Sequence, residues 1–155
     1  MTIKVGRKIP AWQLDATGEK KIRSKDLLGQ PVVLYFYPRD STPGCTTEAQ
    51  NFRDLQKQFK KYDAVILGVS KDSLKSHQRF CEKQALTFDL LSDPDEVLCQ
   101  LFGVIKLKKM YGKEFEGIER STFLIDSKGV LRHEWRKVKV KGHVEEVLET
   151  VKSLA

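Results

Sequence analysis

The residues of this 155-residue chain with the most chemistry open to them are its three cysteines, Cys45, Cys81 and Cys99. Their number is odd and no two are spaced as C-x-x-C, which argues against a disulfide framework. The three histidines stand at no zinc-ligand spacing from a cysteine, so the sequence predicts no metal site. Two interpretations remain, which are buried unreactive thiols and thiol redox chemistry.

Cys45 stands in the most informative segment, YFYPRDSTPGCTTEA, over residues 35–49. A buried strand ends there, a turn with proline and glycine follows, and a helix begins with Cys45 in its first turn. Unpaired backbone N–H groups and the positive end of the helix dipole favour a thiolate at this place. We therefore predict a reactive Cys45. The competing interpretation is a small apolar residue at a helix start.

The elements that must position Cys45 alternate along the chain. Apolar patterns predict strands over 32–37, 64–69, 87–91, 121–125 and 130–135, and an N-terminal hairpin around 12–23. Helices are predicted over 43–62, 73–85 and 142–154, with another that is capped by Asp93 and ended by Gly103. This order predicts an α/β fold, with a partly parallel sheet and helices on both faces, and residues 1–155 as one domain.

Charge and hydropathy narrow the class of protein. The net charge of +7 comes from both ends of the chain, which predicts a solvated surface and no nucleic-acid partner. The longest apolar run, Val32–Tyr37, is too short for a membrane span or a secretory signal, so we expect a cytoplasmic protein. A nucleic-acid or holdase-type binding module is the alternative. Its best support is the alternating lysines of Lys137–Lys141, which we predict to protect an edge strand.

The run Pro38-x-x-x-Thr42-x-x-Cys45 resembles the signature of the peroxiredoxins. The longer segment 35–49 is similar to the peroxiredoxin Q subfamily, also called bacterioferritin comigratory protein. Further matches are VGxxIP at 5–10, LSDP at 91–94 and GIxRSTFLID at 117–126. The resemblance implies a thioredoxin-like fold, with a central mixed sheet flanked by helices. It also implies thiol-dependent reduction of hydrogen peroxide and organic hydroperoxides.

The resemblance also implies roles for individual residues. Cys45 is then the peroxidatic nucleophile, Thr42 and Arg120 stabilise the charge that develops on the peroxide, and Pro38 walls the pocket. Glu48 is expected to orient an arginine. Each residue has a plain structural alternative: Thr42 as a helix N-cap, Arg120 as a surface residue, Pro38 as a strand end and Glu48 as a first-turn acid.

The resemblance offers two places for the resolving thiol, which would attack the oxidised Cys45. Part of the subfamily carries it five residues after the nucleophile, where this chain has Gln50. Another part carries it on the next helix, and Cys81 fits that arrangement. We expect a Cys45–Cys81 disulfide, formed after local unwinding of the first turn at Cys45 and of the Cys81 helix. The alternatives are Cys99 acting between two molecules and an external thiol.

The resemblance implies thioredoxin as the reductant and a monomer, with no metal, haem or flavin. Lys106, Lys108 and Lys109 are expected to form a loop beside the site, where they could dock an acidic reductase. A thioredoxin-type disulfide oxidoreductase fits poorly, because Glu48 stands where its second cysteine is needed. A glutathione-peroxidase-like enzyme fits poorly as well, because its Gln and Trp partners are not evident around Cys45.

Overall fold

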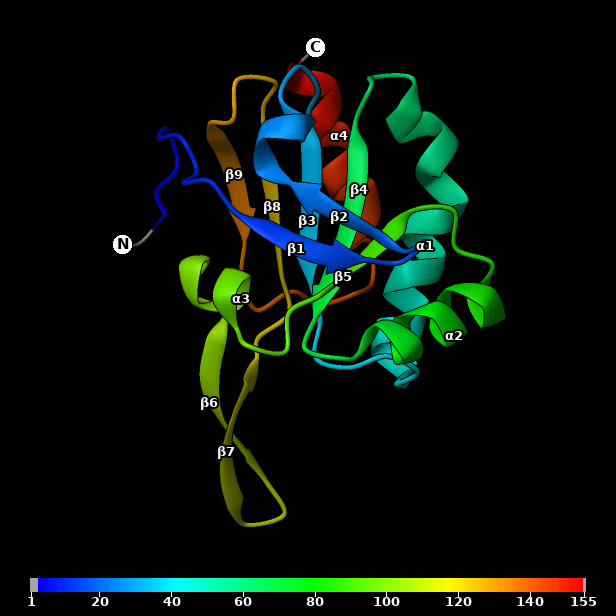
Figure 1. Ribbon diagram of the computed structural model, residues 1–155, viewed down its shortest axis with the longest axis vertical. Helices are drawn as coiled ribbons and strands as arrows, with labels where there is room; N and C mark the ends of the chain where they lie inside the picture. The colour runs from blue at the N-terminus through cyan, green and yellow to red at the C-terminus, as the bar shows by residue number, and fades with distance from the viewer. Residues whose placement is uncertain (1–2, 155) are drawn as a thin grey trace.

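The computed structural model describes residues 3–154 and has a seven-stranded sheet at its centre (Figure 1). The strand order is β2-β1-β5-β4-β3-β8-β9. Strands β3, β4 and β5 pair in parallel, whereas β1, β2, β8 and β9 pair antiparallel with their neighbours. The strands of this sheet are β1 Gln13–Ala16, β2 Lys20–Arg23, β3 Val32–Phe36, β4 Val65–Ser70, β5 Asp89–Ser92, β8 Ser121–Ile125 and β9 Leu131–Trp135. The predicted mixed sheet is confirmed.

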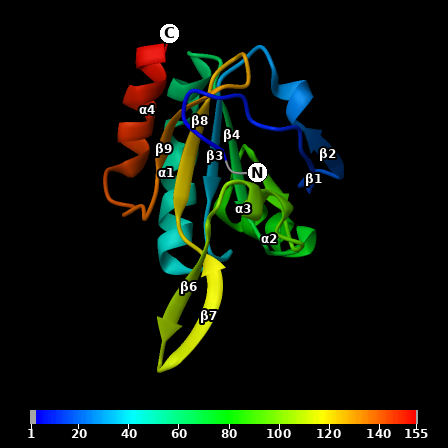
Figure 2. The ribbon, with the colours of Figure 1, turned by 90° about the vertical axis from the view of Figure 1, so that its left-hand side faces the viewer.

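Helices cover both faces of the sheet, as predicted (Figure 2). They are α1 Pro43–Lys60, α2 Leu74–Gln84, α3 Val97–Leu101 and α4 His143–Leu154, with a 3-10 turn at Ser24–Leu27. Helices α1 and α4 lie side by side on one face, and α3 lies on the other. Within residues 3–154, no helix has both the length and the apolar character needed to cross a membrane.

The two layers of the core follow from the alternation of side chains along β3. Tyr35 points to the α1 side, where its ring stacks on Phe52 with centroids 4.5 Å apart. Phe36 points to the α3 side, where its ring lies 5.3 Å from that of Phe102. All five residues of β3 are buried, which agrees with the continuous apolar run that predicted this strand.

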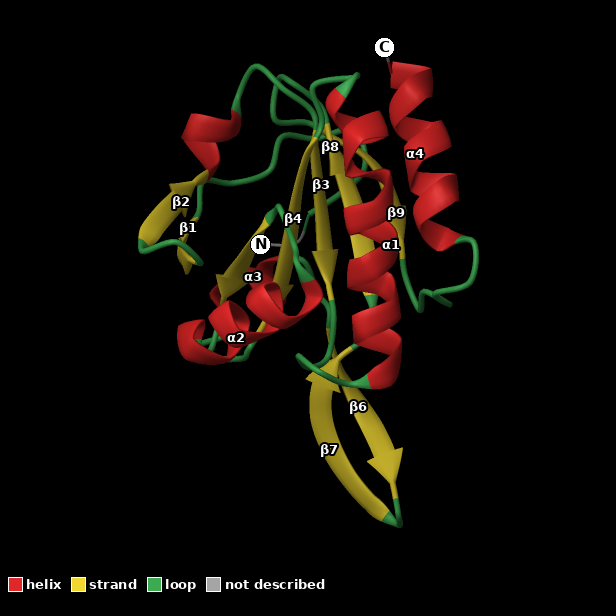
Figure 3. Cartoon of the chain, turned by 90° about the vertical axis from the view of Figure 1, so that its right-hand side faces the viewer, coloured by secondary structure: helices red, strands yellow, loops and turns green. Residues whose placement is uncertain are grey.

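A separate hairpin projects from the body of the molecule (Figures 1 and 3). Its strands are β6 Ile105–Met110 and β7 Lys113–Ile118, and the turn between them places Tyr111 and Gly112 at positive φ. The expectation of a loop at Lys106–Lys109 is therefore wrong, because these lysines belong to β6. Most side chains of the hairpin are exposed, so the sequence has no apolar face that would mark the strands.

Two further expectations are corrected by the structure. Residues 137–141 form an irregular connection to α4 and not an edge strand. Helix α3 begins four residues after the predicted cap, because Glu96 takes a left-handed conformation with φ of 59° after a turn. The Asp93 carboxylate nevertheless accepts the backbone N–H groups of Val97 and Cys99, both at 2.8 Å, and so still caps this helix.

Candidate active site

Cys45 lies just beyond the carboxyl end of β3, in the first turn of α1. Pro43 begins the helix, where its missing N–H costs nothing, and the N–H of Thr46 reaches the carbonyl of Thr42 to close the first turn. The Cys45 side chain is buried in the layer between α1 and the sheet. The fold therefore places the thiol at the strand ends where α/β sheets bind ligands.

Arg120 reaches Cys45 although the two residues are 75 positions apart. It directly precedes β8, which pairs antiparallel with β3 so that Ser121 lies opposite Phe36. This register brings Arg120 beside the end of β3 and the start of α1. Its Nη2 donates a hydrogen bond to Cys45 Sγ at 3.3 Å. The predicted proximity of the arginine and the thiol is present in the structure.

Glu48, one turn after Cys45, holds the other end of the same guanidinium. Arg120 Nη1 donates to Glu48 Oε1 at 2.7 Å, and the Glu48 side chain is fully buried. The expected orienting contact is therefore present. Gly44 leaves room for it, because a Cβ there would lie 3.2 Å from Arg120 Nη2.

Burial and charge act against each other in this group. Burial raises the pKa of Glu48 to about 7, and the charge and hydrogen bond of Arg120 limit that rise. Burial disfavours the charge on Arg120, but Glu48 and Cys45 outweigh it and raise the pKa of Arg120 above its ordinary value. The guanidinium is therefore a permanent positive charge against the sulfur.

Thr42 and Pro38 stand in the connection between β3 and α1. Thr42 takes the N-cap position with an extended backbone, but its hydroxyl makes no capping hydrogen bond and donates to the carbonyl of Arg39 at 2.9 Å. Pro38 is half-buried in the bend after Tyr37. Both lie within seven residues of Cys45 along the chain.

The other two cysteines differ in surroundings, and all three are free thiols. Cys81 is half-buried on α2 and packs against the same apolar layer as Cys45. Burial and the charges of Asp40 and Asp89 raise its pKa to about 11. Cys99 is fully buried on the opposite face of the sheet, and burial together with Asp93 raises its pKa strongly. Cys99 is thus enclosed, and a partner molecule does not reach it in this conformation.

Gln50 occupies the position where part of the subfamily has its resolving cysteine. Its Nε2 donates to Oε1 of Gln84 at 2.8 Å, and the neighbouring Arg53 donates to the carbonyl of Gln84 at 2.7 Å. The Gln50 side chain therefore ties α1 to the last turn of the helix that carries Cys81.

Two residues near the site were missed or misplaced by the sequence analysis. Tyr35 is fully buried, and burial followed by the charge of Glu48 raises its pKa. Lys108 reaches the site from β6. Burial and the charge of Arg120 lower its pKa. The apolar pattern of residues 32–37 predicts that Tyr35 is buried and says nothing about its neighbours.

A metal-like grouping lies beside the site and is closed by its own hydrogen bonds. Within residues 3–154, one group of side chains has ligand atoms close enough together to hold a metal ion, and it consists of Asp40, Asp72 and His77. His77 Nδ1 is already bonded to Asp40 and His77 Nε2 to the carbonyl of Leu91, so neither nitrogen is open to a metal. This geometry does not point to a metal centre.

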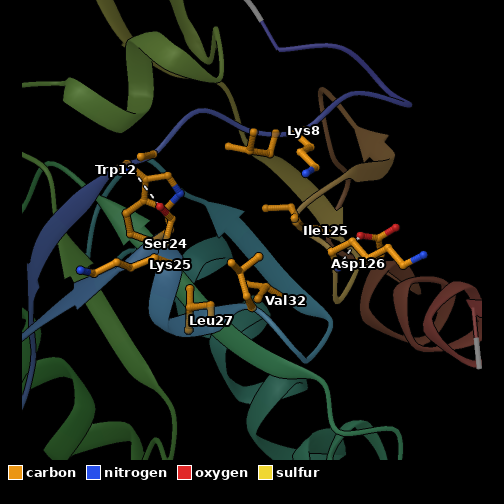
Figure 4. Close-up of a pocket in the computed structure, with 13 residues that line it drawn as sticks. Lys8, Trp12, Ser24, Lys25, Leu27, Val32, Ile125 and Asp126 are labelled. Atoms are coloured by element: carbon orange, nitrogen blue, oxygen red, sulfur yellow. Dashed lines mark hydrogen bonds between the residues drawn. The ribbon is translucent and has the colours of Figure 1, made fainter.

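A cavity of about 230 Å³ lies at the other end of β3, under the 3-10 turn (Figure 4). Its walls include Trp12, Leu27, Val32 and Ile125, and none of the three cysteines lines it. Val32 is the first residue of β3, whereas Cys45 follows the last. The cavity is therefore not part of the thiol site.

A buried thiol that receives a hydrogen bond from an arginine, on a thioredoxin-like sheet, defines a thiol-dependent peroxidase. Comparison with known proteins agrees with this class. The model of the AhpC/TSA family matches residues 5–134, and the chain belongs to that family.

Similar proteins fix the subfamily. The chain is 53% identical to peroxiredoxin Bcp of Bacillus subtilis over 155 residues, which cover 100% of this chain and 99% of that one. It is 39% identical to peroxiredoxin Bcp of Escherichia coli, over 99% of this chain and 98% of that one. A solved structure of PrxQ from Xylella fastidiosa superposes with a TM-score of 0.92 at 46% identity, covering 97% and 96% of the two chains. A structure of the bacterioferritin comigratory protein of Xanthomonas campestris, studied for alkyl peroxide reduction, superposes with a TM-score of 0.88 at 50% identity. The match covers 92% of this chain and 90% of that one.

Proposed function

We propose that Cys45 is the peroxidatic nucleophile of a peroxidase acting on hydrogen peroxide and organic hydroperoxides, with Cys81 as the resolving thiol and thioredoxin as the reductant. The observation that carries the proposal is the hydrogen bond from Arg120 Nη2 to Cys45 Sγ at 3.3 Å. A fixed positive charge at this distance stabilises a thiolate, which is the reactive form of cysteine.

In the first step the thiolate sulfur attacks the hydroperoxide oxygen that carries the hydrogen. An S–O bond forms and the O–O bond breaks, so Cys45 becomes a sulfenic acid. The other oxygen leaves as hydroxide or alkoxide and takes a proton from water. Arg120 can stabilise the charge that develops on the oxygens, and the Thr42 hydroxyl can join it by turning away from the Arg39 carbonyl.

In the second step the Cys81 thiol attacks the sulfenic sulfur. An S–S bond forms, and the hydroxyl group leaves as water with the proton of the thiol. The position of Cys81 supports this role, because Cys81 borders the same apolar layer as Cys45. In addition, cysteine-to-serine variants of Xanthomonas campestris peroxiredoxin Q have been solved at two positions 36 residues apart, the separation of Cys45 and Cys81 in this chain.

The cycle closes when a dithiol reductant opens the disulfide by exchange and takes up the oxidation itself. Thioredoxin is the reductant that we propose, acting on a monomeric enzyme in the cytoplasm, where free thiols are the stable form. No metal, haem or flavin has a part in these steps.

The test is a non-reducing peptide map after one equivalent of hydrogen peroxide, with the remaining thiols blocked. We expect a Cys45–Cys81 link in the parent and in the control variant Cys99→Ser. Cys45→Ser should consume no peroxide, and Cys81→Ser should complete one turnover but resist recycling by thioredoxin. A link that includes Cys99, or an oxidised Cys45 without any link, would reject Cys81 as the resolving residue. An unreacted Cys45 would reject the enzyme.

A further inference from the structure

A buried polar cluster joins the loop before Cys45 to the helix that carries Cys81. At its centre is Asp40, whose Oδ2 lies 2.7 Å from His77 Nδ1 and accepts the Ser76 hydroxyl at 2.8 Å. The Tyr37 hydroxyl donates to Asp40 Oδ1 at 2.5 Å. His77 is completely buried and Asp40 nearly so. None of these four residues has a part in the chemical steps above.

The geometry shows how the pair is held. His77 Nε2 lies 2.9 Å from the carbonyl of Leu91, which can only accept, so this nitrogen donates. Burial alone would raise the pKa of Asp40, but the hydrogen bonds and charge of His77 and the hydroxyls of Tyr37 and Ser76 lower it. The contact is thus a charge-assisted hydrogen bond in a buried place.

The pair connects the two segments that disulfide formation must move. Asp40 lies five residues before Cys45, and His77 lies one helical turn before Cys81. A disulfide requires Cα atoms within about 7 Å, whereas the structure holds both cysteines as free thiols in folded helices. Drawing them together shifts the start of α1 against α2, which are the elements that Asp40 and His77 fasten.

We propose that Asp40 and His77 are positioning residues that latch the site closed. With the latch intact, Cys45 stays beside Arg120 for attack on peroxide, and breaking it is part of the opening that lets Cys81 reach the sulfenic acid. The latch therefore sets the balance between the two steps. The proposal rests on the proposed function in naming Cys81 as the resolving thiol.

The test distinguishes the hydrogen bond made by His77 Nδ1 from the one made by His77 Nε2. In His77→Gln the amide nitrogen can replace Nε2 and keep the bond to Leu91, while the bond to Asp40 is lost. In His77→Asn the amide takes the place of Nδ1 and can restore the bond to Asp40. Ser73→Ala removes the N-cap of α2, which accepts the N–H of Ser76, and leaves the side chains of Asp40, Ser76 and His77 unchanged, so it controls for a weakened helix.

Single-turnover mixing with hydrogen peroxide gives separate rate constants for sulfenic acid and for disulfide formation. We expect His77→Gln to form the disulfide roughly tenfold faster, the scale set by the loss of one charge-assisted hydrogen bond. The same variant should form the sulfenic acid more slowly and yield less sulfinic acid at high peroxide. His77→Asn should move both rate constants back toward the parent, and Ser73→Ala should not reproduce the split.

A merely structural His77 would give a different pattern, with both steps slowed together and no rescue by His77→Asn. That result, or unchanged disulfide formation in His77→Gln, would overturn the latch while leaving the peroxidase in place. If His77→Gln does not fold, Tyr37→Phe and Ser76→Ala each remove one bond to Asp40, and both must accelerate disulfide formation. A parent that forms no Cys45–Cys81 disulfide would overturn the choice of Cys81, and the latch with it.

Discussion

Arg120 contacts two residues with two different nitrogens, and in the proposed mechanism this arrangement activates the thiol. Nη2 donates to Cys45 and Nη1 donates to Glu48, so the carboxylate fixes the plane of the guanidinium while its other edge faces the sulfur. Fixed donors aimed at a reacting group need no reorganisation during the reaction.

Removing this donor should slow the first step. In Arg120→Ala we expect the rate constant for peroxide reduction to fall by roughly 10²–10³, the effect of losing one preorganised donor. The rate at neutral pH should also recover in part at high pH, where more thiolate forms without help. Stopped-flow measurement from pH 5 to 10 checks both points. Arg132→Ala, which removes a half-exposed arginine paired with Asp126, serves as the control. Equal rates in Arg120→Ala and the parent would return Arg120 to a structural role.

Glu48 predicts how stability changes with pH. Its pKa is raised to about 7 in the folded protein from an ordinary 4.5, so the folded state favours the protonated acid. The resulting stabilisation is complete below pH 4.5 and is lost as pH rises through about 7. The side chain introduced by Glu48→Gln stays neutral and keeps an oxygen that can accept from Arg120. The melting temperature of this variant, relative to that of the parent protein, should therefore rise between pH 5 and pH 8. Glu145→Gln, on the exposed side of α4, should give a curve parallel to that of the parent. A parallel curve for Glu48→Gln would refute the argument.

At the scale of elements, apolar periodicity was enough to find the strands and helices that have a buried side. Strand β8 is present over the predicted residues, and α1 begins at the predicted Pro43. The hairpin of β6 and β7 was missed because its side chains are mostly exposed on both faces.

The candidate site was likewise predictable only in part: its residue types have sequence signals, but their contacts do not. Sequence motifs identified Cys45, Thr42 and Arg120 as residue types, but the contact between Cys45 and Arg120 depends on the pairing of β3 with β8, which no local pattern specifies. The Asp40–His77 pair has no sequence signal of its own, because a polar residue in a loop, such as Asp40, or an isolated one in an amphipathic helix, such as His77, is usually solvated.

Helix α3 offers a test of an element that is fixed by one side chain. It has five residues, too few for a stable isolated helix, and Asp93 satisfies two of its first N–H groups. Asp93→Ala should lower the free energy of unfolding by about 1–2 kcal/mol. Urea denaturation measures this, with the exposed Asp95→Ala as the control, for which we expect a change below about 0.5 kcal/mol. Equal midpoints for the two variants would show that packing of Leu98 and Phe102 holds α3 without the cap.

At the scale of the whole molecule, the sheet separates two apolar layers that contact different cysteines. The layer under α1, α2 and α4 contains Cys45 and borders Cys81, whereas the layer under α3 contains Cys99 and Phe102. Only the first layer must open for the proposed disulfide. Phe80 on α2 is buried there, so unwinding α2 around Cys81 exposes apolar surface on that side of the sheet.

Hydrogen exchange should therefore report a one-sided opening when the enzyme is oxidised. We expect protection to fall in residues 38–46 and 74–86, because both segments must leave their helical or looped positions for the two sulfurs to bond. Strand β8 and helix α3 should keep the protection that they have in the reduced protein, because β8 is held by its ladders to β3 and β9 within the sheet and α3 lies on the other face of the sheet. Cys81→Ser treated with one equivalent of peroxide is the matched control and should show no change in residues 74–86. Loss of protection throughout the sheet would mean that disulfide formation loosens the whole fold, and the latch between Asp40 and His77 would then be too local a device to govern it.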